Sequence, residues 1–180
     1  PGSSFKPYVY LTAFTKGYLP ETMLYDTETD FETAEGKSYR PNNYDGKFHG
    51  PVSMMRALGG SLNVPAVKTL YLVGVNDAVE VAHSLGITGI RDPDRVGLSL
   101  VLGGGEVKLI DHVSSYGTLA TGGVKHKQAV ILRIEDAKGN IIEGGSHGGK
   151  GPQKSAKNSP SLEDRIGAWE QGGFVGDREG

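Results

Sequence analysis

The sequence contains no cysteine, and this absence removes several kinds of chemistry at once. It excludes disulfide bonds, zinc sites built on thiolates, and cysteine nucleophiles. Long apolar runs are missing too: stretches such as Ala129-Val-Ile-Leu132 are only a few residues long, whereas a membrane span needs about 20. We therefore expect neither a membrane span nor a signal peptide within these 180 residues.

An excess of charge of one sign is also lacking. Lysine and arginine number 19 against 21 aspartates and glutamates, which gives a net charge of −2. Because no positive field would draw the chain onto phosphates, we predict no nucleic-acid partner. The five histidines lack the paired spacing of metal ligands, and Gly103-Gly-Gly105 is not followed by the lysine of a phosphate-binding loop. We expect no metal and no cofactor.

What the chain does have is an ordinary globular composition, with 37% apolar and 22% charged residues, enough for one modest core. Apolar periodicity and capping residues predict a helix-rich middle followed by a β-hairpin: helices over 3–18, 54–58, 65–72, 77–85 and 106–120, and strands over 128–135 and 141–142 around a turn. Residues 20–51 are polar and turn-rich, which predicts a long ordered loop. Glycine, lysine and serine dominate 144–180, which predicts a loose tail.

The first candidate site is Ser3-Ser-Phe-Lys6, at the head of the first predicted helix. A serine and a lysine three residues apart lie on one helical face, so the amine can take the proton of the hydroxyl. The helix N-terminus would favour the negative charge that develops. This spacing predicts an activated serine nucleophile, and its alternative is a helix-capping serine beside a solvated lysine.

The second candidate is Ser61-Leu-Asn63, in a tight loop before a helix. A hydroxyl and a carboxamide two residues apart could pass a proton to the serine–lysine pair and hold a substrate amide. The alternative is an ordinary loop that caps a helix. Spacing alone does not decide between the two.

Longer segments around these motifs carry a family resemblance. In one order the chain contains Pro1-Gly-Ser-Ser-Phe-Lys-Pro7, Asn43-Tyr-Asp-Gly-Lys-Phe-His-Gly-Pro51, Ser61-Leu-Asn-Val-Pro-Ala-Val-Lys68, Gly97-Leu-Ser-Leu-Val-Leu-Gly-Gly-Gly-Glu-Val107 and Tyr116-Gly-Thr-Leu-Ala-Thr-Gly-Gly123. Over residues 1–143 this resembles the transpeptidase domain of class A (bifunctional) penicillin-binding proteins, within the serine β-lactamase and D,D-peptidase superfamily. The resemblance implies domain boundaries of 1–143 for a partial transpeptidase domain and 144–180 for the tail.

The resemblance also implies roles for four residues. Ser3 would be the acylated nucleophile and Lys6 its base, Ser61 would relay a proton to the leaving amine, and Asn63 would bind the substrate amide. The implied reaction is peptidoglycan D,D-transpeptidation on stem peptides that end in D-Ala-D-Ala, with β-lactams trapping the same serine. The implied location is the outer face of the bacterial cytoplasmic membrane, in a membrane-anchored parent protein with a glycosyltransferase domain.

The implied fold is α/β of the α+β kind, an antiparallel sheet flanked by helices beside an all-helical subdomain, here as an incomplete, helix-rich piece. The family's third motif, Lys-Thr-Gly, occurs nowhere in the sequence; Lys157 is either a degraded remnant of it or part of the tail. Two alternatives therefore stand beside transpeptidation. One is a hydrolase of the carboxypeptidase or β-lactamase type, and the other is a catalytically incomplete fragment.

Overall fold

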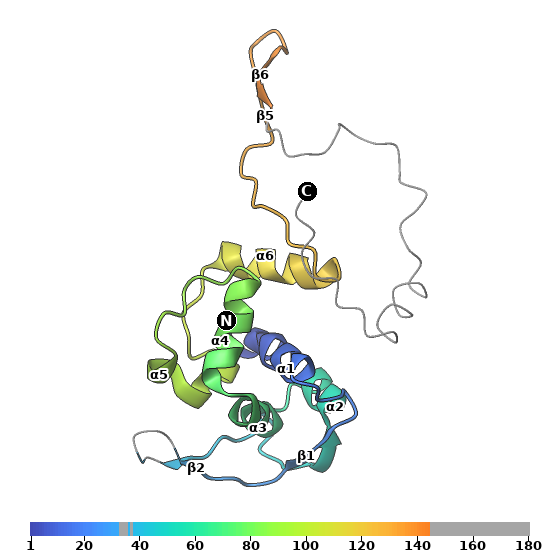
Figure 1. Cartoon of the computed structure of the whole chain (residues 1–180), viewed down its shortest axis with the longest axis vertical. Coiled ribbons are helices and arrows are strands. Elements are labelled where there is room, and N and C mark those ends of the chain that lie inside the picture. Colours follow the sequence, from blue (N-terminus) through green and yellow to red (C-terminus); the bar gives the residue numbers. More distant parts are fainter. Residues whose placement is uncertain (33–35, 37, 145–180) are drawn as a thin grey trace. The chain divides into compact units, whose positions relative to one another are not determined.

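The computed structural model describes residues 1–32, 36 and 38–144, and the chain divides into two units, Pro1–Gln128 and Ala129–Gly180 (Figure 1). The first unit is mainly helical. Its helices are η1 (Gly2–Phe5), α1 (Lys6–Thr15), α2 (Met54–Gly59), α3 (Asn63–Val73), α4 (Val75–Ser84), α5 (Pro93–Val96), η2 (Gly97–Leu102) and α6 (Leu109–Ala120). Its strands are β1 (Met23–Asp26), β2 (Phe31–Glu32), β3 (Ser38–Tyr39) and β4 (Gly50–Ser53).

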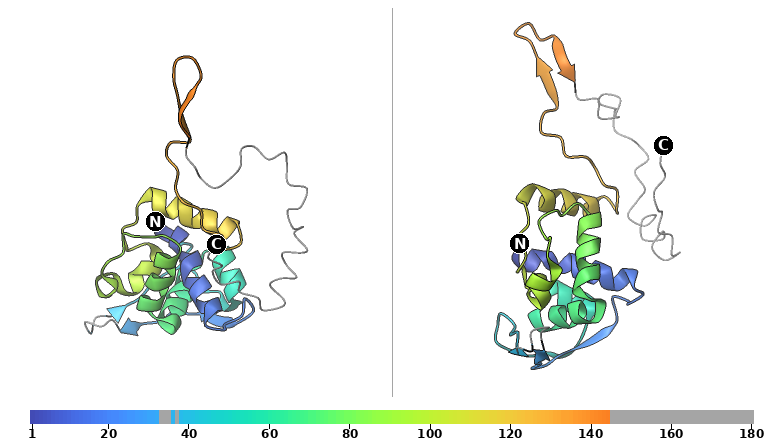
Figure 2. Two further views of the ribbon diagram at one scale, coloured as in Figure 1. Left: turned by 45° about the horizontal axis from the view of Figure 1, so that its top comes forward. Right: turned by 60° about the vertical axis from the view of Figure 1, so that its left-hand side comes forward.

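Helix α1 runs through the core of this unit, in contact with α2, α3 and α4 (Figure 2). Tyr8, Val9, Tyr10 and Ala13 are fully buried, so the helix is apolar on more than one face. This agrees with a helix that other helices surround rather than one that lies on a surface. The expected helix at 3–18 is present, but its first turn is the 3₁₀ turn η1, which places Ser3 before the α-helix begins, and α1 ends at Thr15 rather than at residue 18.

Local sequence signals predicted some helix starts correctly and others wrongly. Ser53 caps α2 as expected, since its Oγ accepts a hydrogen bond from the backbone N–H of Arg56. Asn76 does not cap α4: Gly74, at φ +89°, ends α3 and leads directly into α4, so Asn76 lies inside the helix. Helix α6 begins at Leu109, later than the expected residue 106.

The expectation of a loop over 20–51 is wrong for its two ends and part of its middle. Strand β1 pairs antiparallel with β4, with Leu24 opposite Val52 and Asp26 opposite Gly50. Strands β2 and β3 form a second antiparallel pair. The strands are only two or four residues long, too short to show a period in the sequence, and β1 pairs with a partner more than 20 residues away.

The turn after η2 approaches the start of the chain closely. Gly103 has φ +91°, and a Cβ added there would lie 2.1 Å from the backbone nitrogen of Gly2. Only glycine fits such an approach. The contact therefore holds the segment that carries Ser3 against η2.

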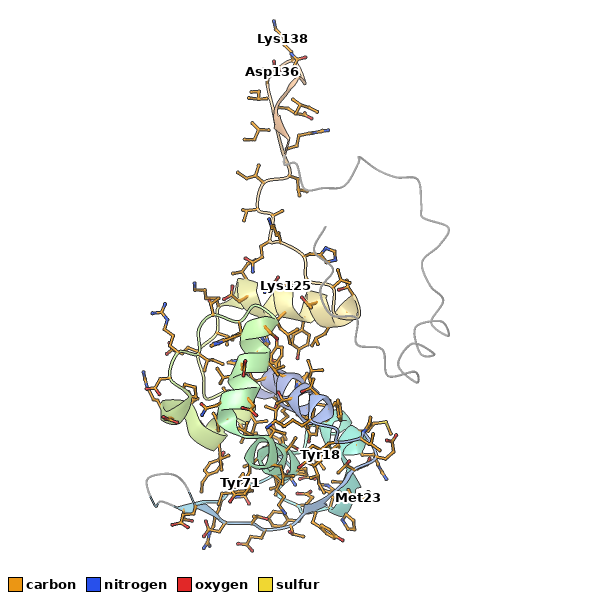
Figure 3. The ribbon with its side chains drawn as sticks, in the orientation of Figure 1. Tyr18, Met23, Tyr71, Lys125, Asp136 and Lys138 are labelled. Atoms are coloured by element: carbon orange, nitrogen blue, oxygen red, sulfur yellow. The ribbon has the colours of Figure 1, made fainter. Side chains whose placement is uncertain are left out.

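The second unit contains the expected hairpin, formed by β5 (Arg133–Glu135) and β6 (Ile141–Gly144), but β5 begins at Arg133 rather than at the expected residue 128. Asp136 and Lys138 lie in its turn (Figure 3), where the Asp136 carboxylate accepts hydrogen bonds from the backbone of Lys138 and from Asn140. The expected tail lies, apart from Gly144, outside the described residues, as does Lys157. Within the described residues no helix is long and apolar enough to cross a membrane.

Candidate active site

Lys6 lies at the centre of a cluster that joins the first residue of α1 to the loop before α3. Its side chain is buried, with 1% of the residue exposed. Its Nζ donates hydrogen bonds to the Ser61 backbone oxygen at 2.6 Å, to Ser61 Oγ at 3.1 Å and to Asn63 Oδ1 at 2.8 Å. Three of the four expected site residues therefore meet at one point.

Burial raises the fraction of Lys6 amines that are neutral. Burial lowers the pKa of its amine from 10.5 to about 8, because an ammonium loses hydration there. Among the described residues no carboxylate forms an ion pair with it. A pKa of about 8 leaves roughly a tenth of the amines neutral at pH 7 and half of them near pH 8. This amine can act as a base near neutral pH.

Ser3 lies in η1, one turn before Lys6. The residue is exposed, and its backbone oxygen accepts a hydrogen bond from the backbone N–H of Lys6. Within the described part of the chain its Oγ makes no hydrogen bond, so the hydroxyl is open to a bound molecule. The structure thus brings Lys6, Ser61 and Asn63 together, while contact of Ser3 Oγ with them stays a prediction.

Ser61 has an unusual backbone conformation. Its φ is +51°, and it is the one non-glycine residue with positive φ among those that the structure describes. The left-handed conformation costs roughly 1–2 kcal/mol for a residue with a Cβ. Two hydrogen bonds stabilise this conformation: the backbone N–H groups of Ser61 and Leu62 donate to the backbone oxygens of Leu58 and Ala57, at 3.0 Å each. Strain of this kind is typical of functional sites.

Asn63 opens α3, and both ends of its amide are engaged. Oδ1 accepts from Lys6, and Nδ2 donates to the Asn42 backbone oxygen at 2.8 Å. Its backbone N–H donates to Asn43 Oδ1 at 2.7 Å. The sequence reasoning identified Asn63 but missed Asn43, although Asn43 opens one of the segments that carry the family resemblance.

A second polar cluster connects α6 to the segment that carries Ser3. Ser4 Oγ donates to the Pro1 oxygen at 2.6 Å and lies 2.9 Å from His112 Nε2, while Tyr8 OH lies 3.1 Å from His112 Nδ1. Tyr116 OH donates to the Ser4 oxygen at 2.7 Å. Burial lowers the pKa of His112, which favours a neutral ring. The cluster holds the residue next to Ser3 in place, and sequence spacing gave no sign of it.

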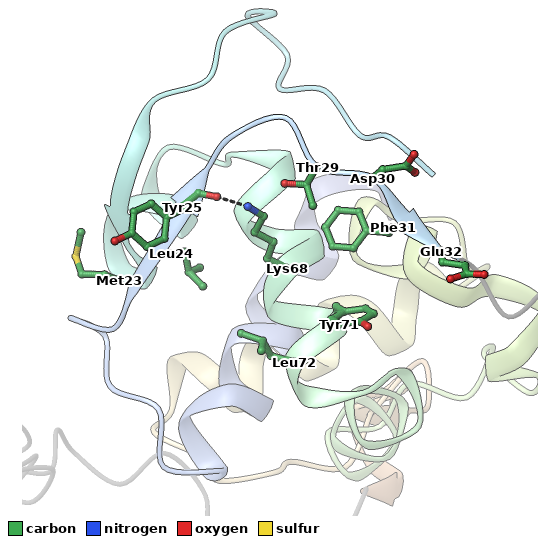
Figure 4. A pocket seen from close by; sticks show the side chains of 10 residues that line it. All are labelled: Met23, Leu24, Tyr25, Thr29, Asp30, Phe31, Glu32, Lys68, Tyr71 and Leu72. Atoms are coloured by element: carbon green, nitrogen blue, oxygen red, sulfur yellow. Dashed lines mark hydrogen bonds between the residues drawn. The ribbon is translucent and has the colours of Figure 1, made fainter. Parts of the chain in front are cut away.

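The structure also contains a surface hollow of about 520 Å³ (Figure 4), lined by Met23, Leu24, Tyr25, Thr29, Asp30, Phe31, Glu32, Lys68, Tyr71 and Leu72. Lys68 reaches across it to donate a hydrogen bond to the Tyr25 oxygen. None of the four expected site residues lines this hollow. No group of three or more metal-ligating side chains occurs within the described residues.

Comparison with known proteins identifies the family of the chain. Residues 1–158 match the family model of the penicillin-binding protein transpeptidase domain. The chain is 37% identical over 144 residues to penicillin-binding protein 2D of Bacillus subtilis (strain 168), covering 79% of this chain and 20% of that protein. It is 32% identical over 143 residues to penicillin-binding protein 1A of Neisseria flavescens, covering 78% and 18%. The chain thus spans about a fifth of the length of these relatives.

Solved structures show the same fold. The crystal structure of penicillin-binding protein 1A from Haemophilus influenzae matches with a TM-score of 0.70 at 24% identity, over 79% of this chain and 21% of that one. Penicillin-binding protein A from M. tuberculosis, as its imipenem acyl-enzyme complex, matches with a TM-score of 0.68 at 19% identity, over 80% and 37%. The expected fold class is confirmed. The chain belongs to the penicillin-binding protein transpeptidase domain family.

Proposed function

We propose that this chain carries the acylation half of a peptidoglycan D,D-transpeptidase site. The observation that supports the proposal most is the buried Lys6 amine, with its pKa lowered to about 8 and its hydrogen bonds to Ser61 and Asn63. Ser3 and these three residues occupy the family's first two motifs. The segment therefore holds a base, a proton relay and an amide ligand beside an exposed hydroxyl.

In the proposed reaction the neutral Lys6 amine takes the proton of Ser3 as Ser3 Oγ attacks the carbonyl carbon of the D-Ala-D-Ala amide. The C–N bond breaks, and Ser61 donates its hydroxyl proton to the departing D-alanine amine while it takes the proton held by Lys6, which leaves Lys6 neutral again. Asn63 binds the peptide amide of the donor strand. The acyl group on Ser3 is then transferred to the amine of a second stem peptide, which restores the hydroxyl.

β-Lactams are proposed as inhibitors of the same serine, supported by the fold shared with a protein that was solved as its imipenem acyl-enzyme. The proposed location is the outer face of the bacterial cytoplasmic membrane, where the substrate is assembled, in a membrane-anchored parent protein. A hydrolase would differ only in the last step, with water replacing the amine. The rate of deacylation with and without an acceptor amine separates the two.

The absence of Lys-Thr-Gly from these 180 residues predicts slow acylation by this chain alone. In the family that motif binds the terminal carboxylate of the substrate and forms one side of the oxyanion hole. Losing one oxyanion-hole donor lowers the rate by a factor of about 10²–10³. We expect a fluorescent penicillin to label the 180-residue chain at least that much more slowly than a complete family member. Labelling at the rate of the complete enzyme would show that other residues here replace the motif.

The strained Ser61 provides a test that separates its hydroxyl from its backbone. We expect Ser61→Gly and Ser61→Ala to slow acylation by penicillin equally, because both lose the relay hydroxyl. Ser61→Gly should have the higher free energy of unfolding, by about 1 kcal/mol, because glycine adopts positive φ without strain. Thermal unfolding and labelling rates check both statements. Acylation of Ser61→Gly at the native rate would remove Ser61 from the mechanism.

A further inference from the structure

Helix α3 receives its N-terminal cap from a distant part of the chain. Its own N-cap residue, Leu62, has no side-chain oxygen and makes no side-chain capping bond. Asn43 instead accepts hydrogen bonds at Oδ1 from the backbone N–H groups of Asn63, at 2.7 Å, and Val64, at 3.2 Å. The first backbone donors of a helix need such a partner. Asn43 therefore supplies the N-terminal cap of α3.

The orientation of the Asn43 amide is itself held from the other side. Its Nδ2 donates to both carboxylate oxygens of Asp26, at 2.9 and 2.8 Å, and to the Lys47 oxygen at 2.8 Å. Asp26 is fully buried at the end of β1 and Asn43 is 5% exposed. The carboxylate also accepts from His49, through its backbone N–H at 3.0 Å and Nδ1 at 2.8 Å. A buried amide with this many partners has one orientation.

The same segment fixes the side chain of Asn63. The Asn42 backbone oxygen accepts from Asn63 Nδ2, which leaves Oδ1 of Asn63 directed at Lys6 Nζ. A continuous series of hydrogen bonds thus runs from Asp26 through Asn43 and Asn63 to Lys6. Asp26, Asn43 and Lys6 are each at most 5% exposed, whereas Asn63 is half-buried.

We infer that Asn43, anchored by Asp26, is a positioning residue of this active site: it sets the start of α3 so that Asn63 and Ser61 close over the Lys6 amine. Its catalytic meaning rests on the proposed function. Asn43 bonds to the backbone of Asn63 rather than to Lys6, so it acts through α3. Losing it should open the 61–64 segment and admit water to Lys6 Nζ.

The direct test is the titration of Lys6, followed by NMR of its labelled side chain in the 180-residue chain. In Asn43→Ala we expect the pKa of Lys6 to rise from about 8 toward 10.5, because burial is what lowers it. Acylation by penicillin should slow by roughly ten- to a hundredfold, the effect of a misplaced catalytic group. Tyr44→Ala is the matched control: it truncates the fully exposed side chain on the other side of Asn43, and should leave both quantities native.

A second control separates positioning from stability. Val73→Ala, at the buried far end of α3, should lower the melting temperature without changing the titration of Lys6. If Asn43→Ala leaves Lys6 titrating near pH 8, the inference is overturned, whatever happens to the melting temperature. The titration of Lys6 does not depend on acylation. Failure of the proposed function would therefore show separately, because penicillin would never modify Ser3 of the native chain.

If Asn43→Ala does not fold, exchanging the two buried groups keeps the inference testable. Asn43→Asp alone places two carboxylates against each other and should raise the pKa of Lys6 through the displaced loop. Adding Asp26→Asn gives a double variant with the carboxylate at position 43 and the amide at position 26. This should return the pKa of Lys6 part of the way toward about 8. A Lys6 titration that is the same in the single and double variants would overturn the role of the Asp26 contact.

Discussion

Replacing Ser3 with alanine will abolish covalent labelling of the chain by a fluorescent penicillin. Acylation needs an oxygen nucleophile, and the exposed Ser3 hydroxyl, one turn before the low-pKa amine of Lys6, is the proposed one. Alanine removes the oxygen and keeps the turn, because η1 has no side-chain cap that involves Ser3. The measurement is fluorescence of the denatured chain after long incubation, scored as moles of label per mole of protein.

Ser4 provides the matched control for this experiment. It carries the same hydroxyl one residue later, but its Oγ is bound to the Pro1 oxygen and to His112. We expect Ser4→Ala to be labelled to the same final extent as the native chain. Labelling that persists in Ser3→Ala and disappears in Ser4→Ala would show that Ser4, and not Ser3, is the nucleophile.

The second large effect concerns Lys6. We expect the native labelling rate to rise with pH and to reach half of its maximum near pH 8, because the neutral amine is the active form and burial lowers its pKa to about 8. Lys6→Met should lower the rate by about 10²–10⁴, the usual contribution of a general base, and should remove this pH dependence.

Lys6→Arg distinguishes a base from a mere positive charge. Arginine keeps the charge but stays protonated at every pH of the assay. If Lys6 acts as a base, Lys6→Arg should be as slow as Lys6→Met. A Lys6→Arg chain that is labelled at the native rate would show that the charge suffices and that no proton transfer to residue 6 is needed.

Several local features of this structure could be predicted from the sequence, and the long-range pairings could not. The cap of α2 at Ser53 and the hairpin turn around Asp136 depend on neighbours a few residues away, so a short stretch of sequence contains the signal. The pairing of β1 with β4 depends on residues more than 20 positions apart, and its strands are too short for periodicity to reveal.

The site shows the same division. Ser3 and Lys6 are one turn apart, and Ser61 and Asn63 share one loop, so each pair forms a recognisable motif. The meeting of Ser61 and Asn63 at Lys6 Nζ was one of two readings that their spacing left open, and the family resemblance favoured it. The cap that Asn43 gives to α3 was not expected at all, because it replaces a local capping residue that Leu62 cannot provide. Buried polar networks of this kind depend on tertiary packing rather than on spacing.

Whether Ser3 is the nucleophile is tested most directly by locating the penicillin adduct with tandem mass spectrometry of the digested native chain. Two candidate hydroxyls, Ser3 and Ser4, lie side by side, and Ser61 lies against Lys6. We expect one acyl group, on Ser3, with fragment ions that exclude Ser4. An adduct on Ser4 or Ser61, or a chain that stays unmodified after prolonged exposure above pH 8, would contradict this expectation.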